Sequence, residues 1–280
     1  MSKKVWEFTD TDLMTFLMQQ EFGNVSGILR IGTAGAATKA AITVATHGKE
    51  VTSGLPAVRW LLEHQARIKD LDLFVVIANE RAANLALCAS GDEWKNFRFT
   101  PGGSDMNRCP VSPSDCSYDT YEGNRAFRLA HSLGGQLDHI LDLHSTDGPS
   151  DPAGLGIFGT DAQVDAIFSV LPVTSVYTGI GAVQGKMGTK TQPFSGFLIP
   201  RRTAIEVELG QTGSREAAEL APIVVQKWLA HLGSLDFALE SKPKPTKRAA
   251  WSIMAPSTDW RVDNERLLEQ YAQVKKGDVL

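Results

Sequence analysis

Short apolar runs alternate with amphipathic segments from residue 9 to residue 232 of the chain. The apolar runs are rich in valine, isoleucine and leucine, which favours buried strands, and they lie at 27–31, 41–45, 71–77, 138–143, 173–177 and 203–210. Apolar residues at helical spacing predict a helix that begins at Thr9 or Asp10, a short helix through Leu85 and Leu87, and longer helices at about 55–68, 121–137, 162–171 and 215–232. Because strands and helices alternate, the pattern predicts parallel crossovers and an α/β fold.

Two of the predicted strands lead into a histidine. The run 41–45 is followed by Thr-His47-Gly-Lys-Glu50, and the run 138–143 is followed by His144. In open α/β sheets, functional sites gather beyond the carboxyl ends of the strands, so we expect His47 and His144 to lie close together. Two histidines and one glutamate, with water in a fourth position, form a known catalytic zinc set. The short H-x-x-E spacing alone also fits an ordinary polar loop between a strand and a helix.

The composition is that of a soluble globular protein, with 42% hydrophobic and 21% charged residues among 280. The net charge of −4 gives no basic surface, so we expect no nucleic-acid partner. We see no signal peptide and no membrane span, and therefore expect no membrane partner. Cys88, Cys109 and Cys116 are odd in number and lack C-x-x-C spacing, which predicts free thiols in a reducing cytoplasm.

The length of the chain favours one large domain with a small appendage. We expect the main domain to cover residues 1–240, and residues 241–280 to form a linker and a short or truncated β-rich segment. Proline and lysine residues over 241–248 predict a solvated linker, and the tail is expected to hold a strand at 250–255 and a helix at 264–274. The small-residue loop 32–37 lacks the G-x-G-x-x-G order, so we expect no dinucleotide site.

Five short motifs follow one another along the chain: His47-x-x-Glu50, Asn79-x-Arg81-Ala82, Asp105-x-Asn107-Arg108, Asp142-Leu-His144-Ser-Thr146 and Glu208-Leu-Gly210. In this order they resemble the succinylglutamate desuccinylase/aspartoacylase family, a branch of the zinc carboxypeptidase-like enzymes, over roughly residues 25–235. The resemblance implies a three-layer α/β fold with a central, mixed and mainly parallel sheet, helices on both faces and a C-terminal β-rich appendage. It also implies a zinc-dependent amidohydrolase that cleaves a small N-acyl amino acid or a related carboxylate-bearing amide.

The resemblance assigns chemical roles to the motif residues. His47, Glu50 and His144 match the ligands of one zinc ion per chain. Glu208 matches the general base, and Arg98 matches the arginine that polarises the scissile carbonyl. A zinc ion with these ligands lowers the pKa of its water to about 7, a carboxylate can take the proton, and an arginine can stabilise the developing oxyanion.

A second group of residues is implied to bind the substrate. Asn107 and Arg108 match the pair that holds a substrate carboxylate, for which an arginine fork beside an amide is well suited. Asn79 matches an asparagine of the same pocket. Separately, Asp142 lies two residues before His144 on the same face of the strand, where it could orient that histidine or be an ordinary polar strand residue. The expected partner is therefore a small carboxylate-bearing molecule.

The chain departs from the family pattern at several positions. Lys49 stands where the family usually has asparagine, and the interval from Arg98 to Asp105 is about two residues longer than usual. Arg201 and Arg202 precede the strand of Glu208, where family members can carry an arginine for a second substrate carboxylate.

Two other functions stay open at this point. One is a metallocarboxypeptidase that acts on peptides, which shares the zinc ligands. The other is a non-catalytic zinc-binding scaffold with a protein partner, although Glu208 argues against it because a binding protein needs no base. The sequence leaves the acyl group, the amino acid and the oligomeric state open, a homo-oligomer included.

Overall fold

The computed structural model describes residues 4–109, 119–178, 194–198, 200–242, 244 and 246–248. These residues belong to one compact unit, Met1–Ala249, and the predicted strand at 250–255 and helix at 264–274 lie outside them. Within the described part, the strands are β1 Glu21–Phe22, β2 Val25–Ser26, β3 Ile28–Gly32, β4 Thr38–Val44, β5 Leu71–Ile77, β6 His139–Thr146, β7 Ala153–Phe158, β8 Ser175–Thr178, β9 Thr203–Gln211 and β10 Thr246–Arg248.

The helices of the same part are α1 Asp10–Met18, α2 Val51–His64, α3 Glu80–Cys88, α4 Tyr121–Leu133, α5 Asp161–Val170, α7 Phe194–Phe197 and α8 Arg215–His231. Short 3₁₀ turns are η1 Val5–Glu7, η2 Gly48–Glu50, η3 Gln65–Arg67, η4 Glu93–Asn96 and η5 Met106–Arg108. Among these helices, none has the length and apolar character that crossing a membrane requires.

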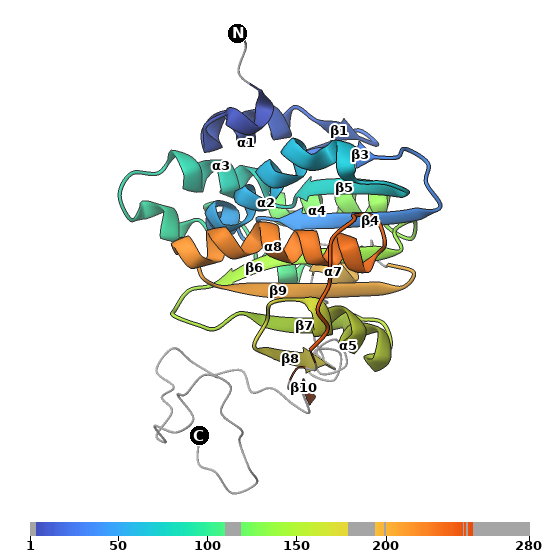
Figure 1. Ribbon diagram of the computed structural model, residues 1–280. Helices are drawn as coiled ribbons and strands as arrows, with labels where there is room; N and C mark the ends of the chain where they lie inside the picture. Colours follow the sequence, from blue (N-terminus) through green and yellow to red (C-terminus); the bar gives the residue numbers. More distant parts are fainter. Residues whose placement is uncertain are drawn as a thin grey trace, which may run out of the picture. The chain divides into compact units, whose positions relative to one another are not determined.

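The described strands build one eight-stranded sheet in the order β10-β8-β7-β9-β6-β4-β5-β3, with β1 and β2 as a separate small hairpin (Figure 1). The pairs β3–β5 and β7–β9 are antiparallel, and the pairs between the remaining neighbours are parallel. This mixed, mainly parallel sheet confirms the predicted fold class. The segment 241–248, predicted as a solvated linker, contains β10, which pairs with β8.

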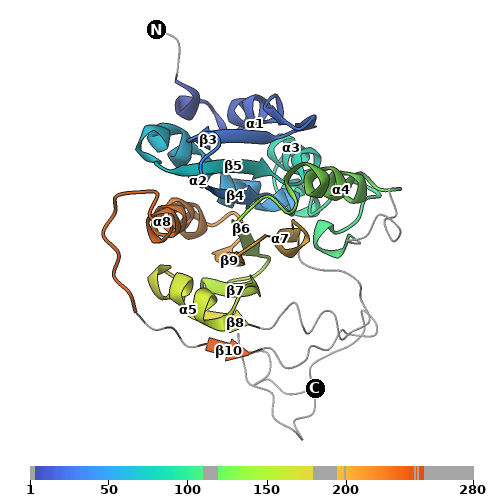
Figure 2. The same ribbon diagram turned by 90° about the vertical axis from the view of Figure 1, so that its right-hand side faces the viewer.

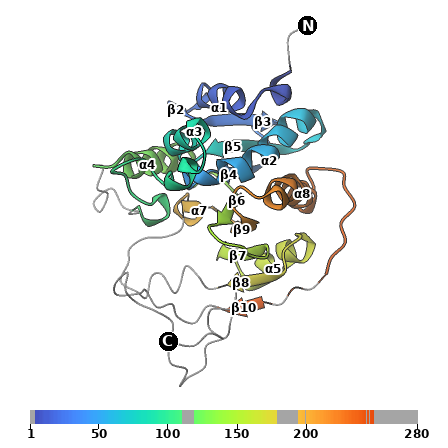
Figure 3. The ribbon, with the colours of Figure 1, turned by 90° about the vertical axis from the view of Figure 1, so that its left-hand side faces the viewer.

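Helices cover both faces of the sheet. One hydrophobic core packs α2, α5 and α8 against one face, and a smaller core packs α4 and α7 against the other (Figures 2 and 3). Buried residues of α1 and α3 also belong to the first core. Strands β4 and β5 are buried along almost their whole length, as expected for central parallel strands that are covered on both faces. Both faces of the central strands are therefore covered, and a site can lie only at the strand ends.

The elements predicted within the described residues are present, with shifted boundaries. The second helix begins at Val51 instead of residue 55, because the 3₁₀ turn η2 leads directly into it. The helix predicted to reach residue 137 ends at Leu133, where Gly134 and Gly135 follow and Gly135 has a φ of +70°. Strand β7 was not predicted.

Candidate active site

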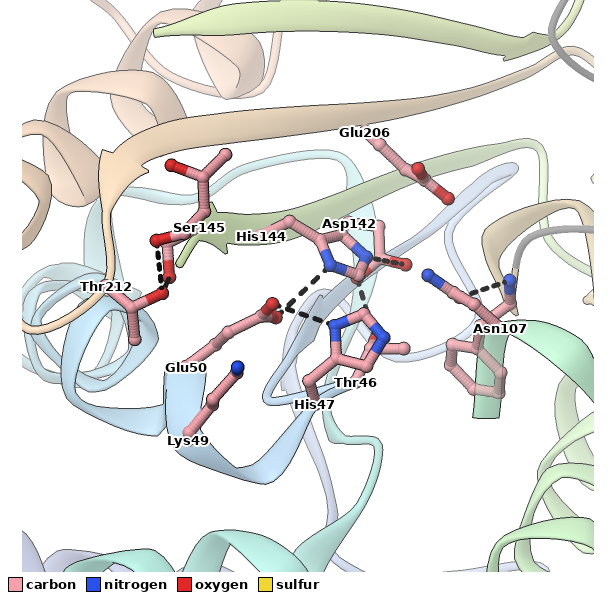
Figure 4. Close-up of polar contacts among 12 residues, drawn as sticks. Thr46, His47, Lys49, Glu50, Asn107, Asp142, His144, Ser145, Glu206 and Thr212 are labelled. Atoms are coloured by element: carbon pink, nitrogen blue, oxygen red, sulfur yellow. Dashed lines mark hydrogen bonds and ion pairs between the residues drawn. The ribbon is translucent and has the colours of Figure 1, made fainter. Parts of the chain in front are cut away.

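The three predicted metal ligands meet at the carboxyl ends of β4 and β6. Their ligand atoms lie within 4.8 Å of one another. His47 Nδ1 is 2.8 Å from Glu50 Oε1, and His144 Nδ1 is 3.2 Å from Glu50 Oε2 (Figure 4). Ala45, which precedes this loop, has a φ of +55°, a backbone conformation that non-glycine residues rarely adopt and that is often found next to functional sites.

The chemistry of these three residues fits a zinc ion. Glu50 is 2% exposed, and its Oε2 lies 3.2 Å from His144 Nδ1 without forming a well-aligned hydrogen bond to any described residue. A buried carboxylate oxygen without a donor is costly, and a cation held between Glu50 and the two imidazoles would satisfy it. Burial alone would raise the pKa of Glu50, but the two neighbouring histidines outweigh it and lower the pKa below its usual value.

A carboxylate lies behind each histidine. His47 Nε2 is 3.1 Å from Asp105 Oδ1, and His144 Nε2 is 3.2 Å from Asp142 Oδ2. Thr46 Oγ1 donates a hydrogen bond to Asp142 Oδ1. A carboxylate in this position fixes the ring orientation and directs the opposite nitrogen, here Nδ1, toward the centre. No role for Asp105 was predicted, although it begins one of the five motifs.

Strand β9 brings two glutamates to the same centre. Its register against β6 pairs Glu208 with His144 and Glu206 with Asp142. Glu208 Oε2 is buried without a hydrogen-bond partner among the described residues, whereas Glu206 Oε1 accepts a hydrogen bond of 2.9 Å from Ser195 Oγ. Burial raises the pKa of both carboxyls against the opposing effect of His144, and that of Glu206 reaches about 7.

Arg98 also reaches the centre. Its Nη2 lies 3.0 Å from Asp105 Oδ2 and 2.8 Å from His47 Nε2, and its side chain is 35% exposed. Its carbonyl oxygen accepts a hydrogen bond of 2.9 Å from Gly48 N, which joins the loop of Arg98 to the loop of the ligands. The guanidinium is thus held beside the candidate metal centre and stays partly open to solvent.

The predicted substrate-binding residues differ in their surroundings. Asn107 Oδ1 accepts a hydrogen bond of 2.8 Å from Phe194 N, which ties η5 to α7. Arg108 ends η5, and its side chain lies outside the described part of the structure. Asn79 is completely buried; its amide oxygen caps α3 at Ala82 N. Contact of these residues with a substrate therefore stays a prediction. In the structure, the buried Asn79 stabilises the start of α3 next to the site.

The residues that depart from the family pattern lie in two places. Lys49 is buried next to Glu50 and forms an ion pair with Asp147. It thus joins the loop 46–50, called the ligand loop because it carries His47 and Glu50, to the loop that follows β6. Arg201 and Arg202 lie at the amino end of β9, six strand residues or about 20 Å from Glu208. Neither arginine reaches the centre.

The fold and the site define an α/β protein with a candidate mononuclear metal centre at the carboxyl edge of a mixed sheet. Residues 36–159, which carry the three candidate ligands, match the family model described as Succinylglutamate desuccinylase/Aspartoacylase catalytic domain. This match supports the resemblance to that family over residues 36–159. No curated protein matches the chain.

Several solved structures share the fold. The product-bound ectoine utilization protein from Ruegeria pomeroyi is 19% identical, with a TM-score of 0.55, and the match covers 79% of this chain and 65% of that one. The succinylglutamate desuccinylase/aspartoacylase from Rhodobacter sphaeroides is 17% identical, with a TM-score of 0.57 and coverages of 79% and 64%. Murine aminoacylase 3 is 21% identical, with a TM-score of 0.51 and coverages of 72% and 65%. The chain thus spans less than two thirds of the length of these proteins.

Proposed function

We propose that this protein is a zinc-dependent hydrolase that cleaves the amide bond of a small N-acyl amino acid or a related carboxylate-bearing amide. The observation that carries the proposal is the buried His47–Glu50–His144 cluster with Glu208 beside it on β9. Two buried carboxylate oxygens, Glu50 Oε2 and Glu208 Oε2, form no well-aligned hydrogen bond in the described structure, and Glu50 Oε2 lies 3.2 Å from His144 Nδ1. One suits a cation, and the other suits a proton from water.

His47, Glu50 and His144 would hold the zinc ion. When bound, zinc acts as a Lewis acid that polarises the scissile carbonyl and lowers the pKa of water to about 7. Glu208 would take a proton from the attacking water and pass it to the leaving amine. Because burial raises the pKa of the Glu208 carboxyl, the group is a stronger base than an exposed glutamate.

Other residues of the chain would bind and orient the substrate. Arg98 would stabilise negative charge on the carbonyl oxygen, and Asn107 with Arg108 would hold the substrate carboxylate in a two-point contact. Asn79 is proposed to support this pocket. The catalytic domain is proposed to cover residues 1–240, in a cytoplasmic protein without nucleic-acid or membrane partners.

The first test is the release of free amine from a panel of N-acyl amino acids at pH 7. We expect release that a chelator abolishes and that added zinc restores. A protein that binds one zinc ion but releases amine only from peptides would instead be a metallocarboxypeptidase. A zinc-bound protein inactive on both substrate classes would favour the scaffold.

Zinc should also stabilise the fold. Protein stripped with a chelator should melt at a lower temperature than the same protein with zinc. At a zinc concentration of 100 times the dissociation constant, binding raises the free energy of unfolding by about 2.7 kcal/mol. Differential scanning calorimetry measures the shift. The His47→Ala variant is the matched control, because it lacks one ligand and should gain little from zinc. An equal rise in melting temperature with zinc in the wild type and in His47→Ala would mean that zinc binds at a site without His47.

A further inference from the structure

Glu122, on the first turn of α4, is a completely buried carboxylate outside the metal centre. Its Oε1 accepts hydrogen bonds from Thr100 N at 2.7 Å and from Asn79 Nδ2 at 3.3 Å. Its Oε2 accepts one from Ser104 N at 3.2 Å. Both oxygens thus accept from donors that belong to two segments far away in the sequence.

One of these segments is the loop that carries Arg98 and Asp105. Glu122 accepts hydrogen bonds from two backbone N–H groups of this loop, at residues 100 and 104. The side chains of Arg98 and Asp105, from the two ends of the same loop, both contact His47 Nε2. The loop closes tightly around the carboxylate: a Cβ on Gly103 would lie 2.2 Å from Glu122 Oε2. Moving Glu122 would therefore move the groups that orient His47.

The other segment is the start of α3. Asn79, which Glu122 holds through its Nδ2, caps α3 by accepting from Ala82 N at 3.2 Å. The ligand loop packs directly on that turn, since a Cβ on Gly48 would lie 2.3 Å from the carbonyl carbon of Ala82. Gly48 is the residue next to His47. Glu122 thus supports the loop of His47 from a second side.

We propose that Glu122 is a positioning residue for the metal centre, which it acts on through the loop 98–105 and through Asn79. The inference rests on the zinc binding proposed above. Because both carboxylate oxygens accept hydrogen bonds, a glutamine at this position turns its –NH₂ toward an N–H donor in either orientation, and one contact becomes a clash of donors. The loop must then shift away from His47.

The test compares zinc affinity in Glu122→Gln and in the wild type, by competition with a chromophoric chelator at pH 7. We expect at least a tenfold weaker zinc affinity in the variant, as for other groups that orient metal ligands. The control is Asp72→Asn. Asp72 is also completely buried and accepts hydrogen bonds from Arg30 and from Gly35 N, but it lies at the amino end of β5. The Asp72→Asn substitution should lower the stability of the fold and leave the zinc affinity within twofold of that of the wild type.

A second variant keeps the test decisive if Glu122→Gln does not fold. Gly103→Ala leaves Glu122 in place but forces a methyl group against it, and should weaken zinc binding in the same way. Gly148→Ala is its control, because a Cβ there meets nothing within 4 Å. Zinc affinities within twofold of wild type for both Glu122→Gln and Gly103→Ala would overturn the inference. A wild type that binds no zinc would instead overturn the proposed function.

A double-mutant cycle separates positioning from a general loss of structure. If Glu122 acts through Asp105, the effects of Glu122→Gln and Asp105→Asn on zinc affinity should be less than additive. Additive effects would contradict the proposed route.

Discussion

Glu206 and Glu208 project from the same face of β9, yet their surroundings differ. Glu206 accepts a hydrogen bond from Ser195, whereas Glu208, which pairs with His144 across the strands, has a buried Oε2 with no donor among the described residues. Burial raises the pKa of both carboxyls, so the pKa does not separate them; what differs is that Glu208 Oε2 accepts no hydrogen bond and is free to take a proton from water. The difference favours Glu208 as the proposed base and Glu206 as a supporting residue.

This assignment predicts different effects of the same substitution. Glu208→Gln removes the proton acceptor, so kcat should fall by about 10²–10⁴-fold while zinc affinity changes little. Glu206→Gln keeps an oxygen for Ser195 and should lower kcat by less than about tenfold. Amine release and zinc content, measured on both variants, check the prediction. Equal losses in the two variants would mean that the base has been assigned to the wrong residue.

At the scale of residues, the sequence predicted the cluster because strand ends and motifs are local patterns. His47, Glu50 and His144 could be placed from the ends of two predicted strands, and the structure brings them together. Asp105 and Glu122 could not be assigned roles in the same way. Their partners lie in other segments, and such hydrogen bonds leave no periodic signal in the sequence.

At the scale of elements, strand β7 shows what the hydrophobic pattern omits. Its sequence, Ala153-Gly-Leu-Gly-Ile-Phe158, is rich in glycine, which is depleted in strands and weakens the pattern. The structure explains the glycine. A Cβ on Gly154 would lie 2.3 Å from the ring of Phe168 on α5, so helix and strand can approach closely only without a side chain there.

Gly154→Ala should therefore destabilise the fold. Overpacking of this kind costs about 1–3 kcal/mol, because the Phe168 ring must leave its preferred position. Urea denaturation would measure the change in the free energy of unfolding. The control is again Gly148→Ala, at a glycine with open space around its Cβ. A variant as stable as the wild type would show that α5 can move away from β7 without cost.

At the scale of the whole molecule, the alternation of strands and helices was enough to predict an α/β fold, but not the order of the strands. Strand β7 lies between β9, to which it is antiparallel, and β8, to which it is parallel, although β8 follows β7 in the sequence and β9 follows both. Strand order depends on contacts between distant segments, which periodicity does not report. The end at which the site lies was nevertheless predictable, since parallel central strands place their carboxyl ends at one edge.

The opposite edge of the sheet holds a titratable group that should control stability without affecting the site. His139 begins β6, five residues before His144, and its Nδ1 lies 2.7 Å from Thr203 Oγ1. Burial and the nearby Arg202 lower the pKa of His139 to about 4, with Asp138 opposing and His231 adding to the shift. An unfolded histidine titrates near 6.5.

The lowered pKa fixes the sign of the pH dependence. Above pH 6.5 the histidine is neutral in both states, and between 6.5 and 4 the unfolded state binds a proton that the folded state does not, so stability is lost as the pH falls. Because His139 is only partly buried, the loss between pH 7 and pH 5 should be about 1 kcal/mol. The His139→Asn variant cannot bind that proton. Between pH 7 and pH 5 its free energy of unfolding should therefore fall by about 1 kcal/mol less than that of the wild type. Urea denaturation of both proteins at the two pH values measures the difference, and parallel losses would mean that the acid sensitivity arises from other groups.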